Sequence, residues 1–230
     1  MVVDFHSHIL PRIDDGSRSV EESLAMLQLS WSQGIRRVIL TPHFYPQQTT
    51  LETFLEMRQH SLELLRQAVR PGMEVPAMLP GAEVYYFPRM SQSDTLQKLA
   101  IEGTRAILVE MPMVTWTDRM YRELEEIYHN QELTPIVAHV DRYLGRFRDY
   151  GIPQRLAELP VLVQANASAF LEGSRGIKLL RSRQIHLLGS DCHNMCSRKP
   201  NLGPALERIS RKLGNNAVRW LRTSEQELLR

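Results

Sequence analysis

Histidines and carboxylates recur in this sequence at the points where runs of apolar residues end. His43 follows one such run, His139 follows another, and Asp191 follows a third. Nine residues of this kind are candidate metal ligands: His6, His8, Asp15, His43, Glu83, Glu110, His139, Asp191 and His193. All of them offer nitrogen or oxygen, which favours Mn, Fe or Zn over a thiolate zinc cluster. Nine ligands exceed what one ion can take, so the sequence predicts two or three ions.

The spacing of these residues strengthens the prediction. His6 and His8 are two apart, and so are Asp191 and His193. Side chains two apart on an extended segment share a face, so each pair can contact one ion. A single His-x-His is weak evidence, and the second pair near the other end of the chain makes chance less plausible. Metal clusters of this kind activate water and stabilise phosphoryl transfer.

Burial is a separate reason to assign the two glutamates as metal ligands. Glu83 and Glu110 each follow an apolar run that should be buried, where an unpaired charge is costly unless it binds metal. Asp14, by contrast, stands in Asp14-Asp15-Gly16, a sequence typical of a turn. We therefore interpret Asp14 as a turn residue only.

Two arginines are placed to bind an anionic substrate. Arg142 lies three residues after His139, and Arg198 lies five after His193. A guanidinium group matches phosphate with two parallel hydrogen bonds. Either arginine alone would be read as a solvated loop residue, but both stand beside candidate ligands. We predict Arg142 and Arg198 as the catalytic residues that grip phosphate.

Cys192 and Arg198 also have the Cys-x5-Arg spacing of cysteine-dependent phosphatases. That mechanism needs a low-pKa thiolate above a loop of small residues with free backbone amides. Here the loop carries His193 and Asn194, and Lys199 rather than a hydroxyl residue follows the arginine. We interpret this match as accidental.

Strand-like and helix-like segments alternate along the chain. The strands are expected at Val2–Phe5, Arg37–Leu40, Met78–Val84, Ala106–Glu110, Pro135–Val140, Val161–Ala165 and His186–Gly189. Helices are expected at 20–33, 51–69, 119–130, 153–158, 177–182 and 204–213, with a terminal turn or frayed helix at 225–230. This order predicts a parallel α/β sheet. A closed barrel fits better than an open doubly wound sheet, because candidate ligands end almost every strand.

Composition limits the class of protein. The chain has 230 residues, 43% hydrophobic and 23% charged, which suits one domain with a large core. A net charge of +2 predicts no broad nucleic-acid surface. No signal peptide or membrane span is expected, since no apolar run approaches ~20 residues. Two cysteines four apart form no disulfide framework, which predicts a cytoplasmic location.

The motifs together resemble those of the polymerase-and-histidinol-phosphatase (PHP) superfamily, and most closely its bacterial metal-dependent protein-tyrosine phosphatases of capsule and exopolysaccharide gene clusters. The similar segments are Asp4-Phe5-His6-Ser7-His8-Ile9-Leu10-Pro11, Asp14-Asp15-Gly16, Thr41-Pro42-His43, Pro80-Gly81-Ala82-Glu83, Val109-Glu110, Ala138-His139-Val140-Asp141-Arg142-Tyr143, Gln164-Ala165-Asn166-Ala167-Ser168 and Ser190-Asp191-Cys192-His193-Asn194. The resemblance implies a distorted (β/α)7 TIM-like barrel, a single PHP domain over 1–230 and a trinuclear site usually loaded with Mn²⁺. It also implies a substrate, the phosphotyrosine tail of a bacterial tyrosine autokinase that regulates polysaccharide synthesis and export.

The resemblance also assigns ligands to ions. One ion would be held by His6, His8, Glu83 and Asp191, a second by Glu83, Glu110 and His139, and a third by Asp15, His43 and His193. The chain departs from the family pattern at Phe44, where a second histidine often stands, and at Asp141, where glutamate is frequent. Residues 85–105 and 143–160 carry little of the signature and are expected to shape the mouth of the site.

Other functions compete with the phosphotyrosine phosphatase. The same site could act on histidinol phosphate or another small phosphomonoester, a nuclease fits the superfamily, and a metal-binding scaffold would need no catalysis. The distance of the phosphate from the peptide backbone favours phosphotyrosine over phosphoserine. Apolar residues just past the candidate ligands are expected near the substrate ring: Phe44, Tyr45, Tyr85, Tyr86, Phe87, Met113 and Trp116.

Overall fold

The computed structural model describes residues 2–144 and 151–229. The described strands are β1 (Val3–Ser7), β2 (Arg37–Leu40), β3 (His43–Phe44), β4 (Ala77–Pro80), β5 (Glu83–Tyr85), β6 (Ala106–Glu110), β7 (Thr134–Val137), β8 (Leu162–Asn166) and β9 (Leu187–Gly189). Every pairing between them is parallel. The alternation of strands and helices predicted from the sequence is confirmed.

One predicted strand is interrupted, and one short strand was not predicted. Gly81 and Ala82 separate β4 from β5 within the predicted strand 78–84, and β3 follows β2 after Thr41 and Pro42, outside the predicted strands. Across these breaks the chains stay side by side, because Gly81 N donates to Leu40 O at 2.9 Å and Glu83 N donates to Pro42 O at 3.0 Å. The hydrogen-bonded orders are β1-β2-β4 and β3-β5-β6-β7-β8-β9. The described strands therefore follow the predicted seven runs in sequence order.

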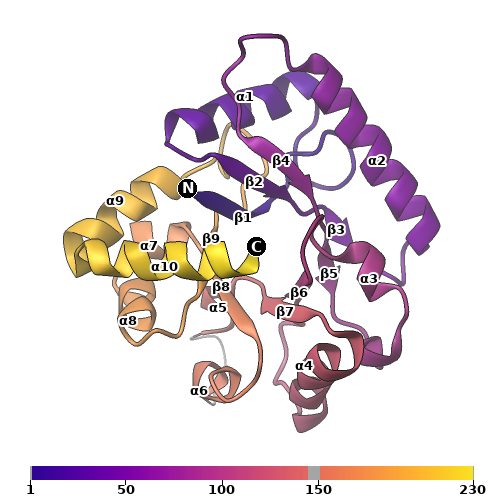
Figure 1. The fold of residues 1–230 in the computed structure, drawn as a ribbon, viewed down its shortest axis with the longest axis vertical. Helices are drawn as coiled ribbons and strands as arrows, with labels where there is room; N and C mark the ends of the chain where they lie inside the picture. The colour runs from indigo at the N-terminus through magenta and orange to yellow at the C-terminus, as the bar shows by residue number, and fades with distance from the viewer. Residues whose placement is uncertain (1, 145–150, 230) are drawn as a thin grey trace.

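The parallel sheet is curled. Figure 1 shows the strands running around the middle of the molecule, with helices outside them. The segment after β9 returns to β1, since Asp191 N donates to His6 O at 2.8 Å and His8 N donates to Cys192 O at 2.9 Å. These contacts bring the first and last described strands together, so the residues that end them lie at one place.

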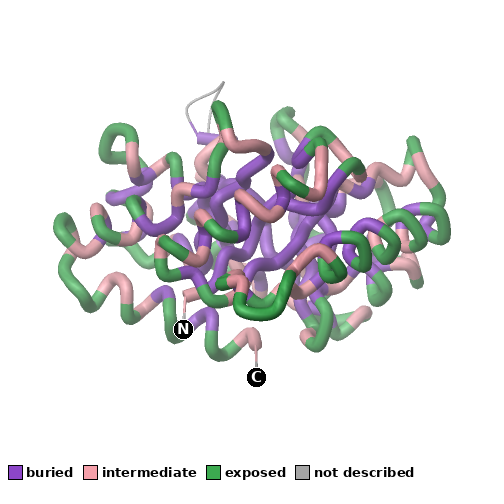
Figure 2. The backbone as a smooth tube through the Cα atoms, turned by 90° about the horizontal axis from the view of Figure 1, so that it is seen from above, coloured by how far each residue is buried: buried purple, intermediate pink, exposed green. Residues whose placement is uncertain are grey.

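The helices lie on the outside of this sheet. They are α1 (Val20–Ser32), α2 (Leu51–Ala68), the short 3₁₀ helix η1 (Met90–Gln92), α3 (Leu96–Leu99), α4 (Asp118–Gln131), α5 (Val140–Tyr143), α6 (Ile152–Leu156), α7 (Ser168–Leu171), α8 (Arg175–Arg181), α9 (Leu202–Leu213) and α10 (Asn215–Leu228). Figure 2 shows buried backbone in the middle of the molecule and exposed backbone at its periphery. Among the described residues, none of these helices is both long and apolar enough to cross a membrane.

The core forms on both sides of the sheet. A small cluster joins Phe5 of β1, Ile39 of β2, Leu108 of β6 and Ile136 of β7, all fully buried. Strands β1 and β6 are not hydrogen-bonded neighbours, so these side chains contact one another across the inside of the curled sheet. The larger cluster packs the outer face of the sheet against the helices. This double burial explains why the strands read as continuous apolar runs.

The last helix was not predicted. The sequence analysis expected only a terminal turn or frayed helix from residue 225, whereas α10 has 14 residues and begins at Asn215. Leu221 is 1% exposed, and Trp220 Nε1 donates to Ile185 O at 3.1 Å. Packing against the rest of the protein, rather than local helix signals, therefore fixes this helix. Arg230, the end of the predicted segment, lies outside the described residues.

A strand boundary was also misplaced. The sequence predicted a strand through Val140, but β7 ends at Val137 and α5 begins at Val140. His139 lies between them with φ of 34°, a left-handed backbone that leaves the strand direction. Of the predicted mouth segment 143–160, residues 145–150 lie outside the described part of the chain.

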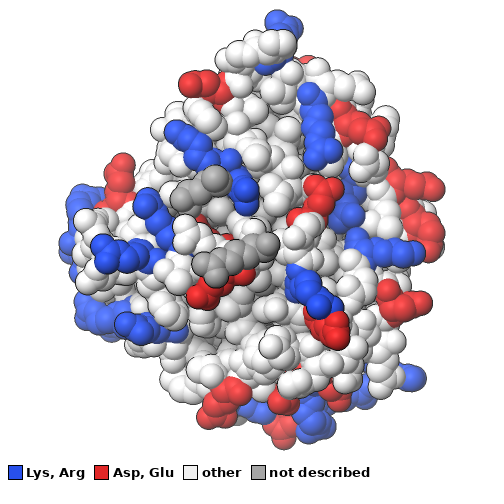
Figure 3. All heavy atoms as spheres, viewed as in Figure 1, with Lys and Arg blue, Asp and Glu red and all other residues white. Residues whose placement is uncertain are grey.

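Charge is divided unevenly along the chain. Residues 174–230 contain 12 Lys and Arg against 4 Asp and Glu, a net of +8, which leaves −6 for residues 1–173 in a chain of net +2. In Figure 3, Lys and Arg gather at the left of the molecule, where Figure 1 places α8 and α9. The near-balanced total therefore conceals a basic side.

Candidate metal centre

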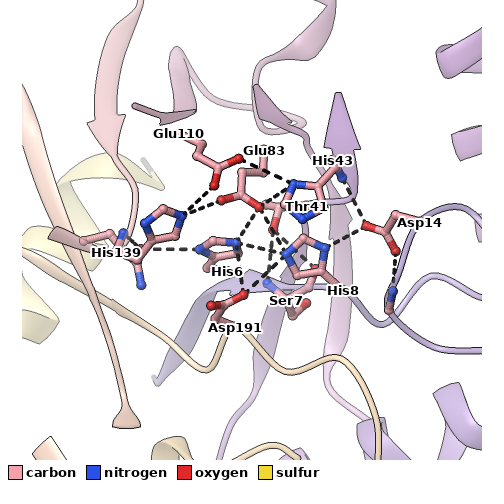
Figure 4. Close-up of polar contacts among 12 residues, drawn as sticks. His6, Ser7, His8, Asp14, Thr41, His43, Glu83, Glu110, His139 and Asp191 are labelled. Atoms are coloured by element: carbon pink, nitrogen blue, oxygen red, sulfur yellow. Dashed lines mark hydrogen bonds and ion pairs between the residues drawn. The ribbon is translucent and has the colours of Figure 1, made fainter. Parts of the chain in front are cut away.

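The candidate ligands gather at the carboxyl ends of the parallel strands. His6 lies within β1, Glu110 ends β6, and Asp191 follows β9. Figure 4 shows seven of the nine candidates converging on one volume, together with Asp14. Most are withdrawn from solvent, although the Asp15 side chain is 67% exposed. The position matches the face where parallel barrels carry their chemistry.

Three overlapping groups have donor atoms close enough to share an ion. They are His6, His8 and Glu83; His43, Glu83 and Glu110; and His8, Asp15, His43 and His193, with all atoms of a group within 4.8 Å of one another. Glu83, His8 and His43 each belong to two groups. The arrangement can therefore hold neighbouring ions that share ligands.

The groups differ in detail from those implied by the family resemblance. Asp191 Oδ1 lies just outside the first group, 3.7 Å from His6 Nε2 and 3.5 Å from His8 Nε2. His139 Nε2 lies 2.9 Å from Glu83 Oε1 and 3.6 Å from Glu110 Oε1, beside the second group. The third group contains the three expected residues and adds His8. All nine predicted residues are brought together.

The donor set fits metal ions better than it fits a hydrogen-bond network. Glu83 is at its centre, and its Oε2 atom lies 3.0–3.2 Å from ring nitrogens of His6, His8 and His43 without a hydrogen bond to any of them. The buried atoms Glu110 Oε2 and His193 Nε2 also lack hydrogen-bond partners. His6 Nε2 and His8 Nε2 face each other at 3.1 Å. Buried polar atoms left unpaired are costly, and shared cations would satisfy them.

The ionisable groups of the site shift one another's pKa values. Burial raises the pKa of Glu83, but the neighbouring histidines, His6 first, lower it well below its usual range. Burial lowers the pKa of His8, yet its contacts with Asp14 and Glu83 raise it to about 10. Burial and the nearby His8 instead lower the pKa of His193 to about 4. At neutral pH these shifts keep Glu83 ionised, His8 protonated and His193 neutral, so a metal ion that binds His8 would displace its proton.

Asp14 does more than the turn assigned to it. Its Oδ1 atom accepts from Gly16 N at 2.9 Å, as a turn residue would. Its Oδ2 atom, however, lies 2.7 Å from His8 Nδ1 and accepts from His43 N at 3.1 Å. A carboxylate on the far ring nitrogen fixes the tautomer and orientation of a ligating histidine. The interpretation of Asp14 as a turn residue only was therefore wrong.

Two side chains at the end of β8 were quoted in a motif but given no role. Gln164 Oε1 accepts from His139 N at 2.6 Å and lies 3.4 Å from His6 Nδ1. Asn166 Nδ2 donates to Asp191 Oδ2 at 2.8 Å. Both are polar residues at the end of an apolar strand, the same signal that identified the ligands. They were missed because amides were not considered as orienting groups.

Backbone geometry at the site is unusual. Asp191 has a left-handed φ of 52°, which is uncommon outside glycine and often marks a functional position. Gly189 ends β9 directly beside His6, and a Cβ atom there would lie 2.4 Å from His6 Cβ. Only glycine therefore lets β9 approach β1 at this level.

Arg142 and Arg198 meet at one carboxylate. Arg198 Nη2 lies 2.7 Å from Asp191 Oδ2, and Arg142 Nη2 contacts the same oxygen. Their side chains are 39% and 36% exposed, so both arginines remain partly accessible from solvent. The pair can bind an anion placed over the candidate metal groups.

The cysteine alternative has no geometric support. Cys192 is fully buried, and this burial raises the pKa of its thiol well above the usual value. The amides of Cys196, Ser197 and Arg198 donate to Asn194 Oδ1 at 2.9–3.1 Å. These amides are therefore not available as a phosphate cradle, as expected from the composition of the loop.

The apolar residues expected near a substrate ring separate into different environments. Phe44 and Trp116 are 3% and 6% exposed and belong to the core, whereas Met113 is 53% exposed. Tyr45 is the member that lies against a candidate ligand, with its ring stacked on His43 at 5.1 Å between centroids. The Tyr85 ring lies 5.4 Å beyond it.

Fold and donor set together define a parallel α/β protein with candidate metal groups at its strand ends. The chain belongs to the capsular polysaccharide synthesis family CpsB/CapC, whose model matches residues 2–229. The prediction of a capsule-associated phosphatase family is thereby confirmed.

Named relatives are similar over nearly the whole chain. The tyrosine-protein phosphatase CpsB of Streptococcus pneumoniae is 29% identical, covering 96% of this chain and 94% of that protein. The tyrosine-protein phosphatase YwqE of Bacillus subtilis (strain 168) is 26% identical, covering 100% and 92%. A crystal structure from a study of YwqE and CpsB, described there as metal-dependent tyrosine phosphatases, has a TM-score of 0.85 at 22% identity, covering 99% and 94%. That last likeness establishes a shared fold.

Proposed function

We propose that this protein is a metal-dependent protein-tyrosine phosphatase. The observation that carries the proposal is the convergence of three overlapping ligand groups with two arginines paired to Asp191. The full-length similarity to proteins named tyrosine phosphatases supports the same activity.

The proposed ligands are the nine residues predicted from the sequence. We assign His6, His8, Glu83 and Asp191 to one ion, Glu83, Glu110 and His139 to a second, and Asp15, His43 and His193 to a third. When bound, such ions supply an activated water and neutralise charge on the phosphoryl group. Manganese is the proposed metal, because the resemblance to the metal-dependent phosphatases implies it; the imidazole and carboxylate donors suit iron and zinc as well.

The remaining steps belong to this chain's own side chains. Arg142 and Arg198 bind the phosphate oxygens and stabilise the charge that develops on them. Asp191 holds both guanidinium groups in place, and Asn166 holds Asp191. Asp14 keeps the His8 ring oriented toward Glu83. Phenolate leaves readily enough that the proposal assigns no general acid.

The wider setting is also a proposal. We infer one PHP-type domain over 1–230, with the curled sheet as a distorted (β/α)7 barrel, since the segment after β9 hydrogen-bonds to β1. The proposed substrate is the phosphotyrosine tail of a bacterial tyrosine autokinase, as the capsule family implies. A cytoplasmic location accords with Cys192 and Cys196 being free thiols.

One assay separates the proposed function from its alternatives. The protein is given a phosphotyrosine peptide, histidinol phosphate or a single-stranded oligonucleotide, each with Mn²⁺ and with chelator. We expect Mn²⁺-dependent turnover of the phosphotyrosine peptide above the others. Faster turnover of histidinol phosphate would indicate a small-molecule phosphatase, and oligonucleotide cleavage would indicate a nuclease. No turnover of any substrate would favour a metal-binding scaffold.

A further inference from the structure

Two cavities lined by described residues differ in their chemistry. The larger, about 670 Å³, is lined by Asp141, Ser168, Ala169, Glu172, Gly173, Ser174, Arg175 and Lys178. The smaller, about 350 Å³, shares Asp15 and His43 with the candidate ligands. Its other lining residues are the polar Asp14, Gln48 and Thr49 and an apolar wall of Ile13, Tyr45, Phe54 and Met57. Only the smaller cavity joins candidate ligands to an apolar wall.

The apolar wall of this smaller cavity, which we name the Tyr45 cavity, is firmly built. The Tyr45 ring is stacked on His43, and its hydroxyl lies 3.3 Å from His43 Nδ1. Phe54 is 2% exposed and packs on Phe44 at 5.0 Å between ring centroids. The wall is therefore positioned by the same residues that build the site.

The rim of the Tyr45 cavity is different in character. Met57 of α2 is 43% exposed although it is a large apolar side chain. A thioether on a flexible stem adapts to aromatic surfaces that approach it. An exposed methionine at the edge of an apolar cavity is thus suited to close over a ring.

We propose that the Tyr45 cavity receives the aromatic ring of phosphotyrosine, with Tyr45 and Met57 as the residues that determine this specificity. The inference rests on the proposed phosphatase function and names its substrate subsite. A volume of about 350 Å³ is at the lower end of the range for ligand pockets, enough for one ring. Benzene fits in a cavity of about 150 Å³.

The arrangement of residues on the two sides of the site indicates how a bound phosphotyrosine would be oriented. Figure 4 places His43 and Asp14 on the side opposite His139, the residue that leads into the segment carrying Arg142. A phosphate held by Arg142 and Arg198 at Asp191 has its ester oxygen free to point toward His43. From there a ring enters the Tyr45 cavity, whereas the short side chain of phosphoserine does not reach the apolar wall.

Binding to the Mn²⁺-loaded protein tests the subsite without turnover. Phenylphosphonate carries a ring where methylphosphonate carries a methyl group, so a change in the ratio of their dissociation constants between variants, measured by calorimetry at one pH, reports the contribution of the ring. Tyr45→Leu should reduce this ratio about two- to tenfold, as loss of an aromatic contact does. Met57→Ala should reduce it about two- to tenfold through loss of the sulfur–aromatic contact.

Two matched controls sharpen the result. Tyr45→Phe keeps the ring and removes the hydroxyl, so the ratio should stay close to that of the wild type. Leu64→Ala removes another exposed apolar side chain from α2, 42% exposed and absent from the cavity wall, and should also leave the ratio unchanged. Metal content confirms that each variant is loaded.

The outcomes separate the subsite from the phosphatase proposal. An unchanged ratio in both Tyr45→Leu and Met57→Ala would overturn the ring subsite, whatever the enzyme hydrolyses. A reduced ratio in a protein that fails to hydrolyse phosphotyrosine peptides would keep the subsite and overturn the proposed function. If Tyr45→Leu fails to bind metal, the result for Met57→Ala decides whether the ring subsite stands, because Met57 lies at the exposed rim of the Tyr45 cavity.

Discussion

A histidine that binds metal needs its second ring nitrogen held, and His8 is held by Asp14 at 2.7 Å. Burial raises the pKa of Asp14, but the hydrogen bond and charge of His8 outweigh it and lower that pKa to about 2. The carboxylate is thus ionised at neutral pH. Asp14 supports the site without belonging to any of the three ligand groups.

Asp14→Asn should weaken metal binding while leaving the fold intact. Loss of such an orienting carboxylate typically lowers metal affinity about 10- to 100-fold. Titration of the metal-free protein with Mn²⁺ measures the effect. Asp118→Asn, which changes an exposed carboxylate on α4 paired with Arg155, is the control. Equal affinity in Asp14→Asn and wild type would return Asp14 to the role of a turn residue.

Arg142→Ala and Arg198→Ala should each lose phosphatase activity and keep metal. Each removes a group expected to stabilise the transition state by roughly 2–4 kcal/mol, so kcat/KM on a phosphotyrosine peptide should fall about 10²- to 10³-fold. Arg181→Ala on α8 is an exposed control. Wild-type kinetics with unchanged metal content would show that the two arginines are solvated loop residues.

Most of the candidate ligands could be predicted because they obey one rule, a polar residue at or near the end of a buried strand; Asp15, in the loop after β1, does not. Glu83 and Glu110 met this rule with no further information. The role of Asp14 could not be predicted from this rule, because its motif is equally typical of a turn. Its contact with His8 forms only in the folded chain. Local sequence does not encode such contacts between loops.

At the scale of elements, α10 carries a buried carboxyl group beneath the sheet. Glu225 is 3% exposed, and its Oε2 atom has no hydrogen-bond partner. Burial raises its pKa to about 8, although nearby positive groups and the Val3 amide oppose the shift. Asp4 lies close enough to raise it further, and burial raises the pKa of Asp4 itself to about 6. Glu225 is therefore mostly protonated in the folded protein at neutral pH.

This carboxyl should make stability depend on pH. The folded pKa lies above the unfolded value of about 4.3, so its contribution is greatest below that pH and is lost as pH rises toward 8. Glu225→Gln mimics the protonated form and should match the wild type near pH 4. Between pH 6 and 8.5 the variant should gain roughly 3 kcal/mol relative to the wild type in urea unfolding. 

Glu227→Gln, an exposed change on the same helix, controls for the loss of one charge. Parallel pH profiles for Glu225→Gln and wild type would show that Glu225 is ionised in the fold.

The alternation of elements could be predicted, since each strand is a short apolar run between helical patterns. The interruption at Gly81-Ala82 could not, because it falls within a run of strand-like hydrophobicity, and the short strand β3 could not, because it follows Thr41-Pro42, where the predicted strand had ended. The helix α10 was missed because its surface is mostly polar, and its apolar residues, Leu221 and Trp220 among them, are seen to be buried or packed only in the folded protein.

At the scale of the whole molecule, the candidate metal centre joins residues of strands from both ends of the chain. Removing the metal leaves buried carboxylates and imidazoles paired only with one another. The bound form is therefore expected to be more stable, by about 2.7 kcal/mol when free metal is 100 times its dissociation constant.

Chelation should consequently lower the melting temperature by about 5–10 °C for a chain of this size. Differential scanning calorimetry with Mn²⁺ and with chelator measures the shift, and Asp191→Ala should show a smaller one. A melting temperature unaffected by metal would argue against these residues as a binding site.

The pairing of the segment after β9 with β1 also determines when the candidate site can form during synthesis of the chain. A ribosome releases β1 first, yet the hydrogen bonds of His6 and His8 backbone groups wait for residues 191 and 192. The early histidines therefore emerge without their partners, and contacts this distant in sequence form slowly. The candidate ligand groups are therefore completed late in biosynthesis, and a chain that stops before β9 would lack Asp191 and His193.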